Sequence, residues 1–124
     1  MNPSFSTETY SPDRLIAGDY PVVTRTMTVL TGQELVRGTV LAKDSGNGDK
    51  LVPVDSGSGT ASIKQPFCVL AQDVDSSGGD VAAPVYLSGE FNEGELTFGG
   101  TDTADTHRDA LRALNIYLKS AVSA

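Results

Sequence analysis

The stretch PFCVLAQDVDSSGGDVAAPVYLSGEF, residues Pro66–Phe91, decides the fold of this chain. Its first run, Phe67–Ala71, is apolar at every position, which fits a strand buried on both faces or a short helix. The length of the run and the turn residues around it favour the strand. The second run alternates as a strand with one buried face does, with one side formed by Val81, Ala83, Val85, Leu87 and Phe91. Asp75–Asp80 is rich in Asp, Ser and Gly, so the whole stretch predicts a central β-hairpin.

Three further strands are expected before the hairpin, because the segments are rich in β-branched residues. Val22–Leu30 alternates and places its threonines on the wetter face. Leu35–Ala42 contains Gly38, which indicates a bulge or a close backbone approach. Lys50–Val54 contains Pro53, which confines this strand to an edge or ends it. Polar, glycine-containing loops separate the strands at Thr31–Gln33, Asp44–Asp49 and Asp55–Thr60.

After a brief strand at Leu96–Phe98, the pattern changes to that of a helix of two or three turns. Thr106 and Asp109 resemble a capping box, with Thr106 as the N-cap and Asp in place of the usual Glu. An apolar stripe at helical spacing follows, formed by Ala110, Leu111, Ala113 and Leu114.

The end of this helix can be placed in two ways. Asn115 suits a left-handed residue that closes the helix, and Ile116–Leu118 then alternates like a short strand. The alternative is a helix that continues unbroken to Val122.

Length and charge limit the classes of function. The 124 residues fit one domain, which we place at residues 15–124, and the many Gly and Pro favour a mainly β protein. A net charge of −7 argues against direct binding of nucleic acid or an anionic membrane. Eight acidic and no basic residues lie between Lys64 and Arg108, which indicates a solvated face or an acidic outer surface. We expect a soluble chain made in the cytoplasm, because no leader or membrane-length apolar run is present.

Residues 1–14 show neither helical nor strand periodicity and predict a flexible N-terminal arm. The arm carries Phe5 and Tyr10. These aromatic residues are either incidental or anchors that become buried on a partner, and composition alone leaves both open.

Chemistry-bearing motifs are weak. His107 is the one histidine and has no serine in a nucleophile-elbow context, so a hydrolase is the weakest of the hypotheses. Asp73, Asp75 and Ser77 match half of a calcium loop, but Pro84 stands where the bidentate Glu belongs. Cys68 lies in an apolar run and is expected to be a small buried residue. We expect no enzyme activity, metal or cofactor.

Five segments in order resemble the head decoration proteins of tailed bacteriophages, the group that includes the phage lambda head protein D. They are IAGDYPVVT at Ile16–Thr24, GQELVRGTVLAK at Gly32–Lys43, CVLAQDVDSSGGD at Cys68–Asp80, PVYLSGEFN at Pro84–Asn92 and ALRALNIYLK at Ala110–Lys119. Asn115 stands where we expect glycine in relatives.

The resemblance implies a compact β-tulip-like domain, mostly antiparallel, with one short C-terminal helix and a flexible arm. It implies homotrimers at three-fold positions on the outer surface of the expanded virion head, bound to the major capsid protein and stabilising the shell. The arm becomes ordered on the shell in such proteins, which favours the anchoring role. We expect the capsid-binding residues to be Phe5, Tyr10, Pro12, Ile16 and Tyr20.

A second class of function is a carbohydrate-binding or adhesive β module. Its stacking platforms would be Tyr20, Tyr86 or Tyr117, clustered on one face beside Asp or Asn. Display of such a module on a capsid is compatible with decoration.

Overall fold

The structure is a computed structural model that describes residues 15–18 and 20–120. It is mostly β, with one α-helix and three short 3₁₀ helices among these residues. The strands are β2 (Val23–Val29), β3 (Glu34–Leu35), β4 (Val40–Asp44), β5 (Lys50–Pro53), β6 (Cys68–Leu70), β7 (Val74–Asp75), β8 (Val81–Asn92) and β9 (Ile116–Lys119). The helices are η1 (Ser45–Asn47), η2 (Ala61–Lys64), η3 (Glu93–Glu95) and α1 (Ala104–Arg112).

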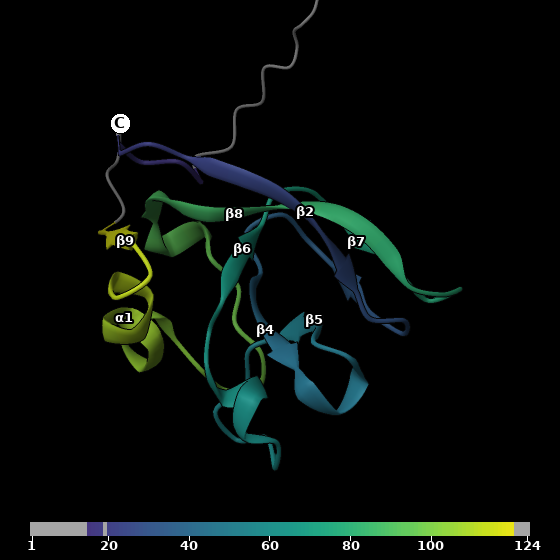
Figure 1. Ribbon diagram of the computed structural model, residues 1–124. Coiled ribbons are helices and arrows are strands. Elements are labelled where there is room, and N and C mark those ends of the chain that lie inside the picture. The colour runs from purple at the N-terminus through teal and green to yellow at the C-terminus, as the bar shows by residue number, and fades with distance from the viewer. Residues whose placement is uncertain (1–14, 19, 121–124) are drawn as a thin grey trace, which may run out of the picture.

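Six strands form one mixed sheet in the order β2-β5-β4-β6-β8-β9, and β2 also pairs with β8. This extra pairing closes the first five strands into a ring, while β9 extends β8 in parallel. The remaining strands, β3 and β7, form a separate two-stranded sheet. Figure 1 shows β2 and β8 as the two long neighbouring strands, with α1 and β9 at one end and β7 toward the other.

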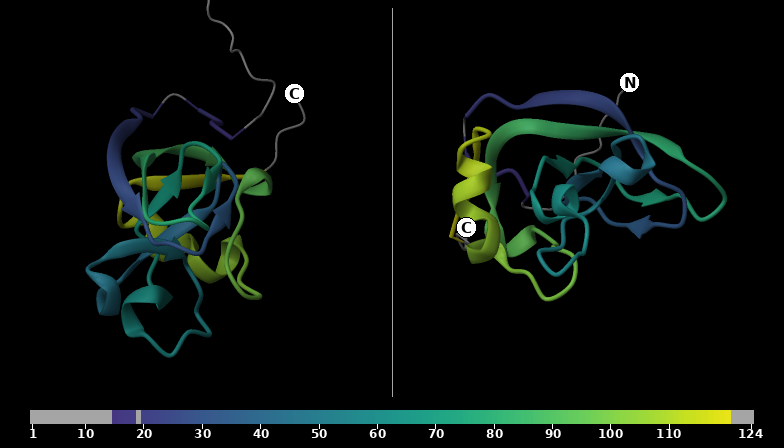
Figure 2. Two further views of the ribbon diagram at one scale, coloured as in Figure 1. Left: turned by 90° about the vertical axis from the view of Figure 1, so that its right-hand side faces the viewer. Right: turned by 60° about the horizontal axis from the view of Figure 1, so that its bottom comes forward.

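The predicted hairpin is present, and β8 is the strand on which it is built. β6 pairs antiparallel with β8 through Val69 and Tyr86. The opposite edge of β8 pairs antiparallel with β2 from Val23 to Val29. Figure 2 shows this long β2–β8 ribbon from a second direction. The alternation along β8 is confirmed at Ala83 and Val85, which are fully buried in one apolar cluster. Phe91 is also fully buried, but it lies in a second cluster together with Tyr86, so the predicted single buried face does not extend to Phe91.

The apolar run Phe67–Ala71 contains β6, which is a strand buried on both faces, as predicted. Cys68 and Leu70 pack inside the ring, whereas Val69 packs on the other side against α1 and β9. β4 divides its side chains in the same way. Two apolar clusters therefore share the central strands: one fills the ring, and the other lies between the sheet, Leu15, Leu111 and Ile116.

Local expectations about backbone chemistry are confirmed at three positions. Gly38 has φ +95° and approaches the Glu95 carbonyl so closely that a Cβ would lie 2.6 Å from the oxygen. Pro53 is the last residue of β5. Asn115 has φ +66°, so the α-helix does not continue to Val122, and the segment after it forms β9.

The predicted start of the helix is wrong by one turn. The N-cap is Thr103, and Thr106 is the third helical residue, whose hydroxyl accepts from the Thr103 amide at 3.0 Å. Asp109 therefore lies in the middle of α1 and is no part of the cap. The predicted apolar stripe is also too wide, because Ala113 and Leu114 are exposed. The buried side of α1 is formed by Leu111 and His107.

Candidate functional site

Only two of the five predicted capsid-binding residues lie in the part of the chain that the structure describes. Phe5, Tyr10 and Pro12 lie outside the described residues, and their role stays a prediction. Ile16 and Tyr20 are described, and both lie beside the last part of β8.

Ile16 continues the β2 edge of β8. It forms an antiparallel bridge with Phe91, while the Ala17 amide donates to the Glu90 carbonyl at 2.9 Å. Leu15, its neighbour, is buried in the cluster below α1, and the Ile16 side chain is 38% exposed. The backbone is thus fixed by the sheet, and an apolar side chain is left at the surface.

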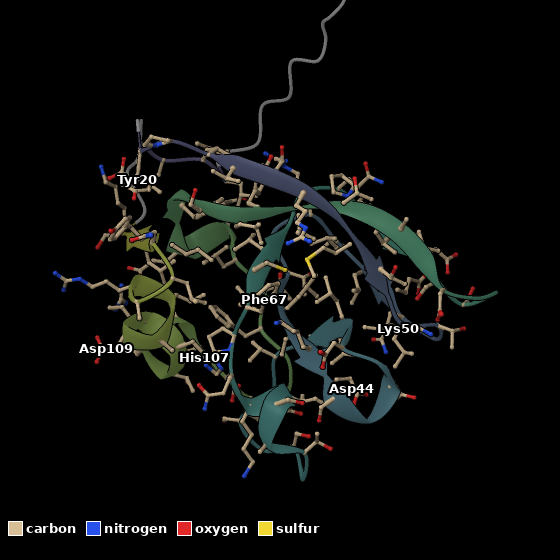
Figure 3. All side chains as sticks on the ribbon, in the orientation of Figure 1. Tyr20, Asp44, Lys50, Phe67, His107 and Asp109 are labelled. Carbon is tan, nitrogen blue, oxygen red and sulfur yellow. The ribbon has the colours of Figure 1, made fainter. Side chains whose placement is uncertain are left out.

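Tyr20 is held by two residues from the end of the sheet, Tyr117 and Glu90. Its ring meets the ring of Tyr117 edge to face, with centroids 4.9 Å apart, and its amide donates to Glu90 Oε1 at 3.0 Å. The Nζ of Lys119 lies 3.5 Å from Glu90 Oε2. We call Tyr20, Glu90, Tyr117 and Lys119 the tyrosine end. Figure 3 shows Tyr20 beside β9, at the end of the molecule away from Lys50.

The sequence leading to the tyrosine end permits this close packing. A Cβ on Gly18 would overlap Glu90 Oε1, so a side chain there would displace the carboxylate that accepts from the Tyr20 amide. Burial, and then the neighbouring Tyr117 hydroxyl, raise the pKa of Tyr20 above its usual value. Tyr20 is therefore neutral at physiological pH and presents a hydroxyl with an apolar ring.

Exposed apolar side chains gather on the segment that includes these residues. Five large apolar residues are exposed in the described part of the chain, and three of them lie between residues 16 and 23. They are Ile16, Val22 and Val23. The two valines were not predicted as site residues, because alternation along Val22–Leu30 placed Val23 on the drier face. Two adjacent apolar residues at the start of an edge strand were the available signal.

One of the three tyrosines predicted to stack on a carbohydrate, Tyr86, packs against other side chains of the protein. The Tyr86 ring packs on Phe91, at 5.5 Å between centroids, and against the apolar cluster near α1, and the Arg37 guanidinium lies over it at 5.6 Å. Tyr20 and Tyr117 lie together with Asn115, which accepts from the Tyr117 hydroxyl at 3.2 Å. Their edge-to-face contact gives no flat pair of parallel platforms.

His107 lies in a buried hydrogen-bonded group. Its Nε2 is 2.7 Å from Asp102 Oδ2, and its ring stacks on Phe98 at 5.7 Å. The Ser56 hydroxyl and amide both donate to Asp102, so the serine contacts the carboxylate and not the imidazole. Burial would raise the pKa of Asp102, but the hydrogen bonds from Ser56 and His107 outweigh it and lower that pKa. The group joins the loop after β5 to α1 and lacks the serine–histidine contact of a nucleophilic triad.

Two carboxylates of the predicted calcium loop accept hydrogen bonds from backbone amides. Asp73 Oδ1 accepts from the Arg37 amide, and Asp75 Oδ1 accepts from the Ser77 amide. Within residues 15–18 and 20–120, no group of three or more His, Cys, Asp or Glu is placed to hold a metal ion. Cys68 is fully buried, and burial raises the pKa of its thiol to about 12, so it behaves as a small apolar residue.

Some carboxylates of the long acidic stretch contact basic side chains. Five of its eight carboxylates contact a Lys, Arg or His side chain, namely Asp80, Glu90, Glu93, Asp102 and Asp105. The acidic outer surface stays a prediction. None of the helices in the described part of the chain has the length and apolar character needed to cross a membrane.

The fold first defines a class: a small, mostly β protein built on a six-stranded mixed sheet. A sequence model of the family described as bacteriophage lambda head decoration protein D matches residues 5–117. The chain belongs to this family of structural phage capsid proteins, which places it on the phage head. A search of curated proteins returned no match.

Proposed function

We propose that the protein binds the outer surface of the expanded head as homotrimers at three-fold positions and stabilises the shell. Membership of the head decoration family is the observation that carries this proposal. Stabilisation follows from linkage: a protein that binds the assembled lattice, and binds free subunits poorly, shifts the equilibrium toward the lattice. Many copies on symmetric sites allow each contact to be weak.

The exposed apolar segment supports a shell-facing role for the tyrosine end. Ile16, Val22 and Val23 lie where the described chain begins, so residues 1–14 join the domain at this end of the molecule. The segment is fixed to β8 by backbone hydrogen bonds before any partner is present, which lowers the entropy cost of binding. We propose that the backbone of the arm pairs with a strand edge of the major capsid protein. Phe5, Tyr10 and Pro12 then pack on the capsid protein.

Co-sedimentation with purified expanded heads of the encoding phage tests the proposal. The full chain should saturate at a fixed number of copies per head, and a chain lacking residues 1–14 should stay folded and lose binding. Full binding by the truncated chain would overturn the role of the arm. Failure of the full chain to sediment with heads would overturn decoration itself.

A matched pair of valines tests the shell-facing end. Val23 is 50% exposed beside the tyrosine end, and Val36 is 52% exposed near the β3–β7 sheet. Val23→Ser should weaken head binding, whereas Val36→Ser should leave it unchanged. Equal effects of the two substitutions would contradict the assignment of this end to the shell.

A further inference from the structure

The ring of five strands is closed at only one end of β2. β2 and β5 share a single registered pair, Val29 with Leu51, and next to it the Leu30 amide donates to the Leu51 carbonyl at 3.0 Å. Between Val23 and Thr28, no strand of the described chain pairs with this edge of β2. The other edge is paired with β8 along the whole strand.

The direction of the peptide groups follows from two observations. The Leu30 amide points toward β5, so even-numbered residues of this strand direct their N–H and C=O away from β8. Thr26 lies opposite Pro84, which has no N–H and whose carbonyl accepts from the Ala71 amide on the β6 side. Both observations give one result: the backbone groups of Thr24 and Thr26 face the open edge.

A groove runs beside this edge. Its volume is about 340 Å³, and it lies between β2 and the loop before β5. It is lined by Arg25, Thr26, Met27, Thr28, Gly48, Asp49 and Lys50. An extended chain placed there would pair with β2 while remaining open to solvent on its outer side.

The edge lacks most of the features that block pairing in other proteins. Exposed edges are usually interrupted by proline, by inward-pointing charge or by a covering segment. From Val22 to Leu30 the sequence has no proline or glycine and is dominated by threonine and valine, which favour strands. The bulge between Val23 and Thr24 lies at one end and leaves Thr24 to Val29 in regular register.

Charge indicates the chemistry of the occupant. Arg25 is exposed and forms no ion pair with any residue that the structure describes, although the chain carries a net charge of −7. Lys50 on the opposite wall pairs with Asp80 at 2.7 Å and is 40% exposed. A strand with a carboxylate opposite Arg25 would therefore be preferred over a basic one.

We propose that the open edge of β2 binds an extended, carboxylate-bearing strand of the capsid shell, which adds to the sheet by β-augmentation. This proposal rests on the proposed function. Continuity supports the shell as the source of this strand, because β2 begins at Val23, inside the exposed apolar segment already assigned to the shell. A partner seated on that segment therefore lies in line with the edge.

A pair of substitutions at Thr26 separates backbone pairing from side-chain contact. Thr26→Pro removes an amide that β8 does not use, and proline is tolerated on a strand edge that faces solvent. Thr26→Val keeps the amide and nearly the same shape. In co-sedimentation with heads, Thr26→Pro should weaken binding about tenfold or more, and Thr26→Val should bind like the unchanged chain. Unchanged binding by Thr26→Pro, or equal losses in both variants, would overturn strand addition.

Amide exchange of the unchanged chain gives a test that needs no variant. On binding to heads, the amides of Thr24 and Thr26 should become protected, whereas those of Arg25 and Met27 should be protected already. Protection of Thr24 and Thr26 that appears in the free chain as its concentration and mass increase would assign the edge to a second copy. Protection in the free monomer that disappears on deletion of residues 1–14 would assign it to the chain's own arm. Either result would overturn the proposal of a shell strand on β2. If the unchanged chain still binds heads in that case, the proposed decoration stands and only the strand addition is wrong.

Arg25 tests the predicted chemistry of the strand. Arg25→Gln should weaken head binding about threefold at low salt and by less at high salt, because an exposed ion pair is screened. Lys64→Gln is the control, since Lys64 lies on η2. An unchanged salt dependence in Arg25→Gln would contradict an acidic partner strand.

Discussion

Gly32 and Gly38 share a backbone conformation but differ in their surroundings. Their φ values are +90° and +95°, so any other residue at either position is strained. Nothing lies within 4 Å of a Cβ added at Gly32, whereas one at Gly38 would press on the Glu95 carbonyl. Gly32→Ala should therefore cost about 1–2 kcal/mol of unfolding free energy, and Gly38→Ala about 1–3 kcal/mol more. Urea denaturation of both variants measures the difference, and equal losses would show that the close approach is unimportant.

Asn115 tests the cost of departing from glycine at the end of α1. Its φ of +66° is left-handed, and its side chain accepts from the Tyr117 hydroxyl. Asn115→Ala should lower the free energy of unfolding by about 1–2 kcal/mol, whereas Asn115→Gly should stay within about 0.5 kcal/mol of the unchanged chain. A helix that continued through residue 115 would give the opposite order, with alanine the more stable variant.

Asp102 links stability to pH. Its pKa is lowered in the folded state, so its contribution is complete above the unfolded pKa of about 3.9 and is lost as pH falls through the folded pKa. Asp102→Asn should cost about 1–3 kcal/mol at neutral pH, and the variant should lose less stability than the unchanged chain below about pH 4. Asp75→Asn is the control, because the Ser77 hydrogen bonds that lower the pKa of Asp75 are at the surface. Parallel pH profiles for Asp102→Asn and the unchanged chain would contradict the assignment.

At the scale of the element, strands could be predicted more closely than the helix. The apolar run around Val69 and the alternation of β8 are local patterns, and both survive in the structure. The helix start could not be fixed, because Thr103, Thr106 and Asp109 form two overlapping capping patterns three residues apart. A long-range contact decides between them: Asp102 binds both His107 and Ser56, which holds the chain just before the earlier cap.

The capping pattern gives an element-scale prediction. Thr103→Ala should lower the free energy of unfolding by about 1 kcal/mol, because the first turn of α1 loses a hydroxyl that caps it. Asp109→Ala should change it by less than about 0.5 kcal/mol, since Asp109 is exposed within the helix. Thermal unfolding of the two variants separates the observed start from the predicted one, and a larger loss for Asp109→Ala would contradict the observed cap.

At the scale of the molecule, the mainly β class followed from composition and periodicity, but the ring did not. Closure depends on β2 meeting β8, two strands separated by residues 30–80, and on a single registered pair between β2 and β5. Three of the five predicted site residues lie outside the described residues, and the other two, Ile16 and Tyr20, came from the family resemblance. Periodicity placed Val23 on the drier face, and it could not show that β2 has an edge without a partner strand.

The central claim is that the chain decorates a phage head through the end that carries Ile16 and Tyr20. Electron cryo-microscopy of expanded heads, with and without the added protein, tests it most directly. We predict added density at three-fold positions of the outer surface, with the tyrosine end against the shell and a new strand beside β2. Heads that show no added density after incubation with saturating protein would contradict the account.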